Sequence, residues 1–303
     1  MKGSIMLGGG ELPGAAFGEP DWEQCEAIAR HHGRTFYFAS RCLPRSQRRA
    51  VLATYAYCRI ADDIVDAADS TGQESALNAL MAWEDQIAHP IDPVAVAFAV
   101  ARAQYAIPTK PVHDLIAGIR MDLTKNRYTD WADLRTYCYH VAGTVGLMVA
   151  PILGCQDGVA LNHAAELGIA MQLTNILRDI GEDARAGRLY LPLDEIEIFG
   201  CRPEEIVAGR PGPRFPDLLD HQISRARTLY ETSREGIPAL DAYGRFTTMV
   251  ASNLYARILS EIESNRYEVF DMRAHCSTKR KILALPVISA RFIGMSLVAR
   301  QVG

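Results

Sequence analysis

The chain has 303 residues, 49% of them hydrophobic, and a formal net charge of −4. This length and apolar fraction suffice for a large core, and the charge shows no global bias toward nucleic acid or an anionic membrane. The seven cysteines include no Cys-x-x-Cys pair, which favours a reduced, cytoplasmic protein that uses cysteine as a small core residue.

Residues 1–20 are rich in glycine and proline and lack the basic start and apolar run of a signal peptide. We therefore expect a mobile N-terminal tail, followed by one domain over residues 21–303. No uninterrupted apolar run reaches the roughly 20 residues of a membrane span. The expected location is the cytoplasm, and peripheral contact with the inner face of the membrane for product release stays open.

Helical periodicity dominates the chain, and alternating strand-like runs are scarce. The first clear helix opens at Pro44 and runs to about residue 69, where Ser-Thr-Gly ends it. Later helices are expected at about 73–88, 92–106, 110–124, 130–154, 158–186, 193–207, 214–236, 238–265 and 277–300. We find no internal repeat and no clear linker, so the simplest architecture is a single all-α helical bundle.

The helix that opens at Pro44 ends in an acidic segment, Asp-Asp-Ile-Val-Asp at 62–66. Asp62 and Asp66 are four residues apart and share one helix face with Arg59 and Tyr55. Carboxylates that face an apolar core are costly unless something neutralises them. Oxygen ligands without a His/Cys cluster favour Mg²⁺, and an arginine fork suits a metal-bound polyanion. A solvated acidic patch is the plainer alternative.

A second acidic stripe follows far along the chain, with Asn175, Asp179 and Asp183 at i, i+4 and i+8. Three oxygen ligands on one face predict a metal site more strongly than two carboxylates do. Gly181 inside this helix costs about 1 kcal/mol relative to alanine, which a close approach by a ligand or a partner helix would explain. The flanking polar and aromatic positions are Gln172, Arg178 and Tyr190. The two stripes could oppose each other across a cavity in a helical bundle.

Two further segments suit an anionic substrate with a long apolar tail. In segment 137–146, two glycines three residues apart allow either close helix packing or a smooth wall for a flexible hydrocarbon. Near the N-terminus, Arg34 and Thr35 could bind phosphate, and Phe36 could line a cavity.

Taken in order, these segments resemble the squalene/phytoene synthase family, most closely its bacterial phytoene synthase branch. The resemblance covers about residues 30–290. It is carried by Thr-Phe-Tyr-Phe-Ala-Ser (35–40), Leu-Pro (43–44), Tyr-Ala-Tyr-Cys-Arg (55–59), Asp-Asp-Ile-Val-Asp (62–66), Met-Asp-Leu (121–123), Arg-Tyr (127–128), Tyr-Cys-Tyr-His-Val-Ala-Gly-Thr-Val-Gly (137–146), Gln-Leu-Thr-Asn-Ile-Leu-Arg-Asp-Ile-Gly-Glu-Asp-Ala-Arg (172–185) and Gly-Arg-Leu-Tyr-Leu-Pro (187–192).

The resemblance implies an isoprenoid synthase fold around a central cavity. It implies a prenyltransferase that joins two geranylgeranyl diphosphates head to head, through prephytoene diphosphate, to phytoene in carotenoid biosynthesis. Mg²⁺ is the implied cofactor, with Mn²⁺ as a substitute, and NADPH is not expected. The implied metal ligands are Asp62, Asp66, Asn175, Asp179 and Asp183. The implied catalytic set consists of the four aspartates among them together with Tyr55 and Arg59. The implied substrate-binding residues are Arg34, Thr35, Phe36, Tyr137, Val141, Ala142, Gly146, Gln172, Asn175, Arg178 and Tyr190.

Several alternatives stay open. The same chemistry on farnesyl diphosphate would give dehydrosqualene, presqualene diphosphate or squalene, and cavity depth decides between the two substrates. A chain elongator or a terpene cyclase would also use Asp-Asp-x-x-Asp, but segment 175–183 matches the second motif of neither. A non-catalytic relative that acts as an assembly protein is the remote alternative. The expected partners are small isoprenyl diphosphates and no nucleic acid, and the oligomeric state stays open.

Overall fold

The computed structural model describes residues 18–68, 72–155, 157–275, 282–283, 285–290 and 292–293. Within these ranges the protein is helical, and the strand-like pairing consists of one isolated bridge between Arg127 and Leu189. The sequence prediction of an all-α protein is therefore confirmed. Most of the tail expected at 1–20 lies outside the described residues, as does much of the helix expected at 277–300.

The helices follow the predicted order from residue 45 onward, and two short N-terminal helices precede them. The elements are α1 (Trp22–His32), α2 (Arg34–Ser40), α3 (Arg45–Asp66), α5 (Gln73–Asp85), α6 (Pro93–Tyr105), α7 (Lys110–Met121), α8 (Trp131–Cys138), the π-helical turn η1 (Tyr139–Gly143), α9 (Thr144–Ile152), α10 (Gly158–Arg185), α11 (Leu193–Ile198), α12 (Pro203–Val207), α13 (Phe215–Ser233), the 3₁₀ turn η2 (Arg234–Ala239) and α14 (Ala242–Ser264).

Aspartate side chains begin many of these helices. Each accepts a hydrogen bond from a free backbone N–H in the first turn, a group that has no partner within the helix. These N-caps are Asp21 for α1, Asp92 for α6, Asp130 for α8, Asp157 for α10 and Asp241 for α14. For α6, α8, α10 and α14, these caps place the helix starts within a few residues of the predicted ones.

Two expected helices differ from the structure. The helix expected at 193–207 is divided into α11 and α12, because the chain turns at Gly200, whose φ of +66° is left-handed. The helix expected at 130–154 is continuous but contains η1, where one turn widens. The short helices α1 and α2 were not expected; α1 is polar overall and buries only Cys25 and Ala29.

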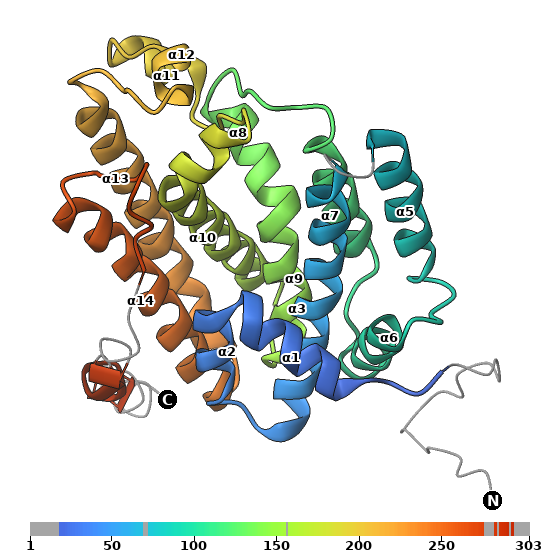
Figure 1. The fold of residues 1–303 in the computed structure, drawn as a ribbon. Coiled ribbons are helices and arrows are strands. Elements are labelled where there is room, and N and C mark those ends of the chain that lie inside the picture. Colours follow the sequence, from blue (N-terminus) through green and yellow to red (C-terminus); the bar gives the residue numbers. More distant parts are fainter. Residues whose placement is uncertain are drawn as a thin grey trace, which may run out of the picture.

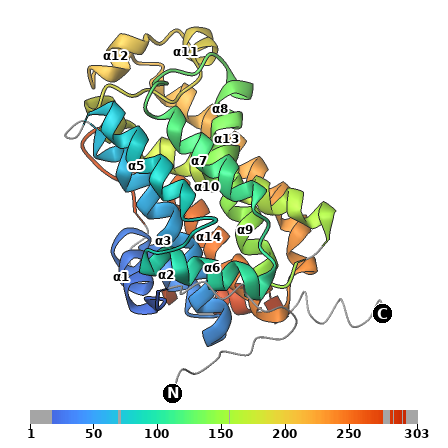
Figure 2. The ribbon, with the colours of Figure 1, turned by 90° about the vertical axis from the view of Figure 1, so that its right-hand side faces the viewer.

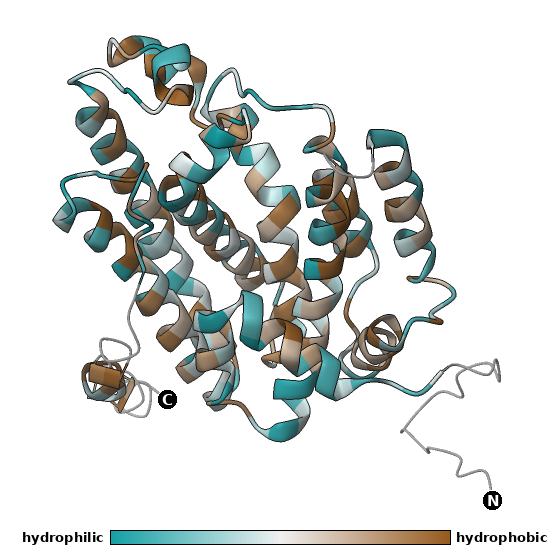
Figure 3. Ribbon diagram, in the orientation of Figure 1, coloured by the Kyte–Doolittle hydropathy of each residue, from teal (hydrophilic) through white to brown (hydrophobic). Residues whose placement is uncertain are grey.

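Two buried clusters form the core, one around α3, α6 and α7 and the other around α10 and α13. Figure 1 shows α3, α9 and α10 in the middle of the molecule, with α5 and α6 on one side and α13 and α14 on the other. Figure 2 shows α11 and α12 together at one end. Figure 3 shows apolar residues concentrated on the inward faces of these helices. Val141 in η1 packs against both clusters, so the region between α3 and α10 joins the two halves of the core.

Candidate active site

The first acidic segment forms the last turn of α3, and Arg59 pairs with its three aspartates. The guanidinium hydrogen-bonds to Asp63 and lies 3.5 Å from Asp66 and 4.0 Å from Asp62. The aspartates are about half exposed, whereas Arg59 is mostly buried. Asp62, Asp66, Arg59 and Tyr55 thus come from one helix, as the periodicity predicted.

The second acidic segment lies near the C-terminal end of α10, where two arginines grip Asp179. Arg178 donates from Nε to Oδ1 at 2.8 Å, and Arg273 donates from Nε to the same oxygen at 2.8 Å and from Nη2 to Oδ2 at 3.1 Å. Arg273 belongs to the segment that follows α14, so the carboxylate joins two distant parts of the chain. Sequence reasoning missed Arg273 because no local pattern singles it out.

The fold brings the two acidic segments to the same end of the bundle. Arg188, just past α10, places its Nη1 atom 3.5 Å from Oδ1 of Asp66 at the end of α3. The negative charge of Asp122 raises the pKa of both Asp62 and Asp183, so this carboxylate lies close to both segments. The carboxylates of the two motifs therefore share one electrostatic environment.

Asp122 also fixes two tyrosines that the sequence analysis selected for substrate binding. Tyr137 donates to its Oδ2 atom at 2.8 Å and Tyr190 to its Oδ1 atom at 3.0 Å. The two tyrosine rings stack on each other with centroids 5.3 Å apart. Asp122 was quoted in the Met-Asp-Leu motif without a role, and the structure makes it the anchor of this aromatic pair.

Crowding of carboxylates shifts their protonation. Burial, together with the charge of Asp66, raises the pKa of Asp62 to about 7 and that of Asp122 to about 6. Burial and the charge of Asp179 raise the pKa of Asp183 to about 7. Burial also works against ionisation of Asp179, but the hydrogen bonds and charges of its two arginines outweigh it and lower that pKa.

The donor set fits a hard divalent cation. All of the candidate ligands are carboxylate or amide oxygens, which Mg²⁺ prefers. The Oδ1 atom of Asn175 is buried without a hydrogen-bond partner, while its Nδ2 donates to Gln172 at 3.4 Å. In the described part of the chain, no three His, Cys, Asp or Glu side chains already converge on one point. Arginines instead pair with Asp62, Asp66 and Asp179.

An apolar cavity of about 240 Å³ opens beside this end of the bundle. Phe36, Ala142 and Gly146 line it, as the sequence analysis expected, and Tyr55 and Asn175 from the acidic helices line it too. The Phe36 and Tyr55 rings stack with centroids 5.0 Å apart. Four other residues expected to line the cavity do not do so, and their contact with substrate stays a prediction; they are Tyr137, Val141, Gln172 and Tyr190.

The close packing expected of the glycine-rich segment is confirmed, and its role as a hydrocarbon wall stays a prediction. A Cβ atom on Gly146 would lie 2.2 Å from the carbonyl oxygen of Ala164, and one on Gly168 would lie 2.2 Å from that of Ala142. The backbones of α9 and α10 therefore approach closely. Gly146 and Gly168 also line the apolar cavity, so close packing does not exclude the predicted wall.

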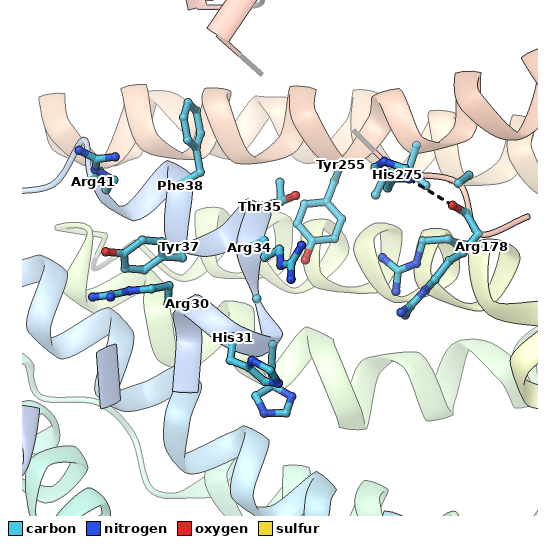
Figure 4. Close-up of a pocket in the computed structure, with 15 residues that line it drawn as sticks. Arg30, His31, Arg34, Thr35, Tyr37, Phe38, Arg41, Arg178, Tyr255 and His275 are labelled. Carbon is cyan, nitrogen blue, oxygen red and sulfur yellow. Dashed lines mark hydrogen bonds between the residues drawn. The ribbon is translucent and has the colours of Figure 1, made fainter. Parts of the chain in front are cut away.

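A larger, basic cleft of about 1040 Å³ lies against the cavity. Figure 4 shows Arg34 and Thr35 near Tyr255, with Arg30 and Arg41 toward one end and Arg178 and His275 toward the other. Tyr255, on α14, lines both the cleft and the apolar cavity. A polar, cationic space thus adjoins an apolar one.

A family model described as squalene/phytoene synthase matches residues 29–280. The chain belongs to this family. The phytoene synthase of Arthrospira platensis is 40% identical over 288 residues, which cover 89% of this chain and 93% of the relative. The 15-cis-phytoene synthase of Synechococcus elongatus is 38% identical, with 89% and 92% covered. The family membership inferred from the sequence is confirmed.

Solved structures agree on the fold. A dehydrosqualene synthase, crystallised with a ligand, is 32% identical and superposes with a TM-score of 0.84 over 90% of this chain and 96% of the other. A squalene synthase from Alicyclobacillus acidocaldarius is 28% identical, with a TM-score of 0.72 over 81% of this chain and 94% of that one. The isoprenoid synthase fold expected from the sequence is thereby confirmed.

This squalene/phytoene synthase family member contains three residues near the site that sequence reasoning did not assign. Asp122 anchors two tyrosines, Arg273 grips Asp179, and Tyr255 stands between cleft and cavity. Asp122 had a usable signal, since it is the acidic residue of the quoted Met-Asp-Leu motif at 121–123. The other two depend on how α14 and the segment after it fold back over α10.

Proposed function

We propose that this chain joins two molecules of geranylgeranyl diphosphate head to head, through prephytoene diphosphate, to phytoene. The enzyme is a prenyltransferase of phytoene synthase type in carotenoid biosynthesis. The observation that carries the proposal is the junction at Tyr255 of an arginine-rich cleft with an apolar cavity. In a diphosphate with a long hydrocarbon tail, the diphosphate suits the arginine-rich cleft and the tail suits the apolar cavity. The phytoene synthases that are 38–40% identical over most of both chains support the choice of substrate.

The mouth of the site is the end of the bundle where the two acidic segments, 62–66 and 175–183, meet. Mg²⁺ fits the oxygen donors there, and we propose Asp62, Asp66, Asn175, Asp179 and Asp183 as its ligands. When bound there, the metal supplies Lewis-acid stabilisation of the departing diphosphate. The Oδ1 atom of Asn175 supports this assignment. It is buried without a hydrogen-bond donor, which costs free energy unless a bound ligand such as the metal satisfies it.

The arginines at the mouth bind and orient the diphosphate groups. Arg59, Arg178 and Arg273 already pair with carboxylates, and Arg34 lines the cleft beside them. Planar guanidinium groups suit phosphate oxygens, and fixed positive charge stabilises the negative charge that develops on the leaving group. Thr35 adds a hydroxyl at the same cleft.

The apolar cavity protects the carbon skeleton during the reaction. After diphosphate leaves one substrate, the allylic cation adds to the 2,3-double bond of the second, and loss of a proton closes a cyclopropane. A second ionisation, rearrangement and proton loss give phytoene without a reductant, so NADPH is not required. The walls around Phe36 and Tyr55 exclude water that would quench each cation, and the ring face of Tyr55 can stabilise positive charge.

Condensation of farnesyl diphosphate is the second candidate, because a dehydrosqualene synthase structure superposes closely. The test is a set of incubations of the purified protein with Mg²⁺ and each diphosphate, without NADPH, and identification of the hydrocarbon. We expect phytoene from geranylgeranyl diphosphate at the higher kcat/KM. A C30 hydrocarbon as the main product, or a cyclopropyl diphosphate as the sole end product, would contradict the proposal.

We propose that the enzyme works in the cytoplasm and contacts the membrane peripherally when its hydrocarbon product leaves. The cysteines at 25, 42, 58, 138, 155 and 201 are all free, which agrees with a reduced compartment. Over the described residues, none of the helices has the length and apolar character needed to cross a bilayer.

A further inference from the structure

The apolar cavity runs a long way down α10 from the acidic mouth. Its lining on this helix begins at Asn175 and repeats at helical spacing to Ala160, near the helix start. Fifteen residues at 1.5 Å per residue correspond to about 22 Å. The far end of the cavity therefore lies about 22 Å from Asn175, which we place among the metal ligands, and any limit on hydrocarbon length is set there.

A histidine, His163, lines that far end. Its neighbours on the cavity wall are small, namely Ala160 and Ala164 on the same helix and Gly236 in η2. Gly236 admits the imidazole, since a Cβ atom there would lie 2.5 Å from the Cβ of His163. The helix and the 3₁₀ turn thus meet at this histidine.

His163 stands between the cavity and solvent. Its side chain is 17% exposed, and its Nε2 atom lies 4.0 Å from an oxygen of Glu235, a side chain that is 75% exposed. Large apolar residues at this end, among them Leu153 and Leu240, pack into the hydrophobic clusters behind them. The leucines are therefore backed by core, whereas the imidazole of His163 faces the exposed carboxylate of Glu235.

We infer that His163 closes the far end of the cavity and limits the length of the hydrocarbon tail that the enzyme accepts. The inference rests on the proposed function and adds to it the residue that determines chain length. The imidazole acts by its size. A smaller side chain at this position lengthens the cavity toward solvent without removing core, and a larger one shortens it.

The test compares His163→Ala and His163→Trp with the matched control Asn162→Trp, in the full-length enzyme. Asn162 is the exposed neighbour of His163 and lines no part of the cavity. The measured quantity is kcat/KM for the C15, C20 and C25 allylic diphosphates. Each isoprene unit adds several carbons to an apolar pocket, where one methylene is worth roughly tenfold or more in specificity.

His163→Trp is expected to lower kcat/KM for the C20 substrate at least about tenfold relative to the C15 substrate. His163→Ala is expected to gain use of the C25 substrate, and Asn162→Trp should keep the wild-type ratios. Glu235→Gln should also keep them, because the ion pair is not what fills the space. If Glu235→Gln changed the ratio of kcat/KM between the C20 and C15 substrates, the ion pair rather than the size of His163 would set chain length, and the inference would be overturned.

The inference is overturned if His163→Trp keeps the wild-type C20-to-C15 ratio, or lowers both activities in proportion. If that variant unfolds, as circular dichroism would reveal, His163→Ala decides alone, and failure to gain the longer substrate counts against the inference. Failure of the proposed function is a separate result. A wild-type enzyme that uses only the C15 substrate refutes phytoene formation, and His163→Ala must then gain the C20 substrate.

Discussion

At Asp179, neighbouring arginines fix the position and charge of the carboxylate before a diphosphate binds. Arg178 and Arg273 hold its carboxylate from two sides, although Arg273 is 94 residues away in sequence. These pairs keep the carboxylate ionised and its arginines oriented before substrate arrives. When metal and diphosphate bind, the metal can replace the arginines at the carboxylate, and the diphosphate can replace the carboxylate at the arginines. Because both groups are already held in position, little reorganisation is needed on binding.

Asp179→Asn should lower kcat at saturating Mg²⁺ by about 10²-fold or more, because it removes a charged oxygen from the mouth. Steady-state kinetics with geranylgeranyl diphosphate measure the loss. Asp217→Asn, a change at an exposed position on α13, serves as the control. Wild-type turnover in Asp179→Asn would refute the assignment of the second acidic segment to metal binding.

Asn175→Leu should separate stability from activity. Its buried Oδ1 atom has no hydrogen-bond partner, so replacing the amide by an apolar group of similar size should raise the free energy of unfolding by about 1 kcal/mol. Activity should fall in the same variant, since a proposed ligand is lost. Urea denaturation without Mg²⁺ gives the first quantity. A less stable variant would show that the oxygen has a partner in the protein.

At the scale of elements, Gly181 explains how the end of α10 receives the segment after α14. The Gly181 N–H donates to the carbonyl of Val269 at 3.3 Å, and a Cβ atom would lie 2.5 Å from the Cα of Phe270. The sequence predicted a close approach here, and the approaching group is this segment rather than a helix. Arg273 reaches Asp179 from the same segment.

Gly181→Ala should destabilise the protein by about 1–3 kcal/mol through overpacking, although alanine favours a helix by about 1 kcal/mol. It should also lower activity, because the shifted segment carries Arg273 away from Asp179. Thermal denaturation and kcat measure the two effects. Gly187→Ala is not a suitable control because its φ is +73°, whereas Gly158→Ala, with open space around it, is. A more stable and fully active Gly181→Ala would contradict the packing described here.

Glu195 joins α11 to α13 and gives a pH-dependent test of that contact. It accepts hydrogen bonds from Arg225 and Gln222, and these outweigh burial and hold the pKa of Glu195 below its usual value. A lowered pKa stabilises the fold above the unfolded-state pKa and ceases to do so as pH falls through the folded value.

Wild type should therefore exceed Glu195→Gln in free energy of unfolding by about 2 kcal/mol at pH 7. The difference should shrink as the pH drops below about 4.5, the usual value for glutamate. Denaturation curves of both proteins across this range measure it. A difference that is constant with pH would mean that the ionised carboxylate does not bind the two helices together.

For the whole molecule, local periodicity was enough to predict an all-α bundle and the acidic stripes on α3 and α10. Each stripe lies on one helix, so spacing alone places its residues. The depth of the cavity was not predictable in this way. Its far end combines the end of α9, the start of α10 and η2, and only the packing of distant segments brings Leu153, His163 and Gly236 together. The cleft is similar, since Arg34, Arg178 and Arg273 come from three parts of the chain.

The central claim is that one site carries out two successive ionisations and ends at a hydrocarbon. Its most direct test is the stoichiometry of a reaction with purified enzyme, geranylgeranyl diphosphate and Mg²⁺, without NADPH, in which phytoene and released diphosphate are quantified together. The account predicts two diphosphates for each phytoene and no reaction after chelation of the metal. One diphosphate per condensation, with a cyclopropyl diphosphate accumulating as the end product, would contradict it.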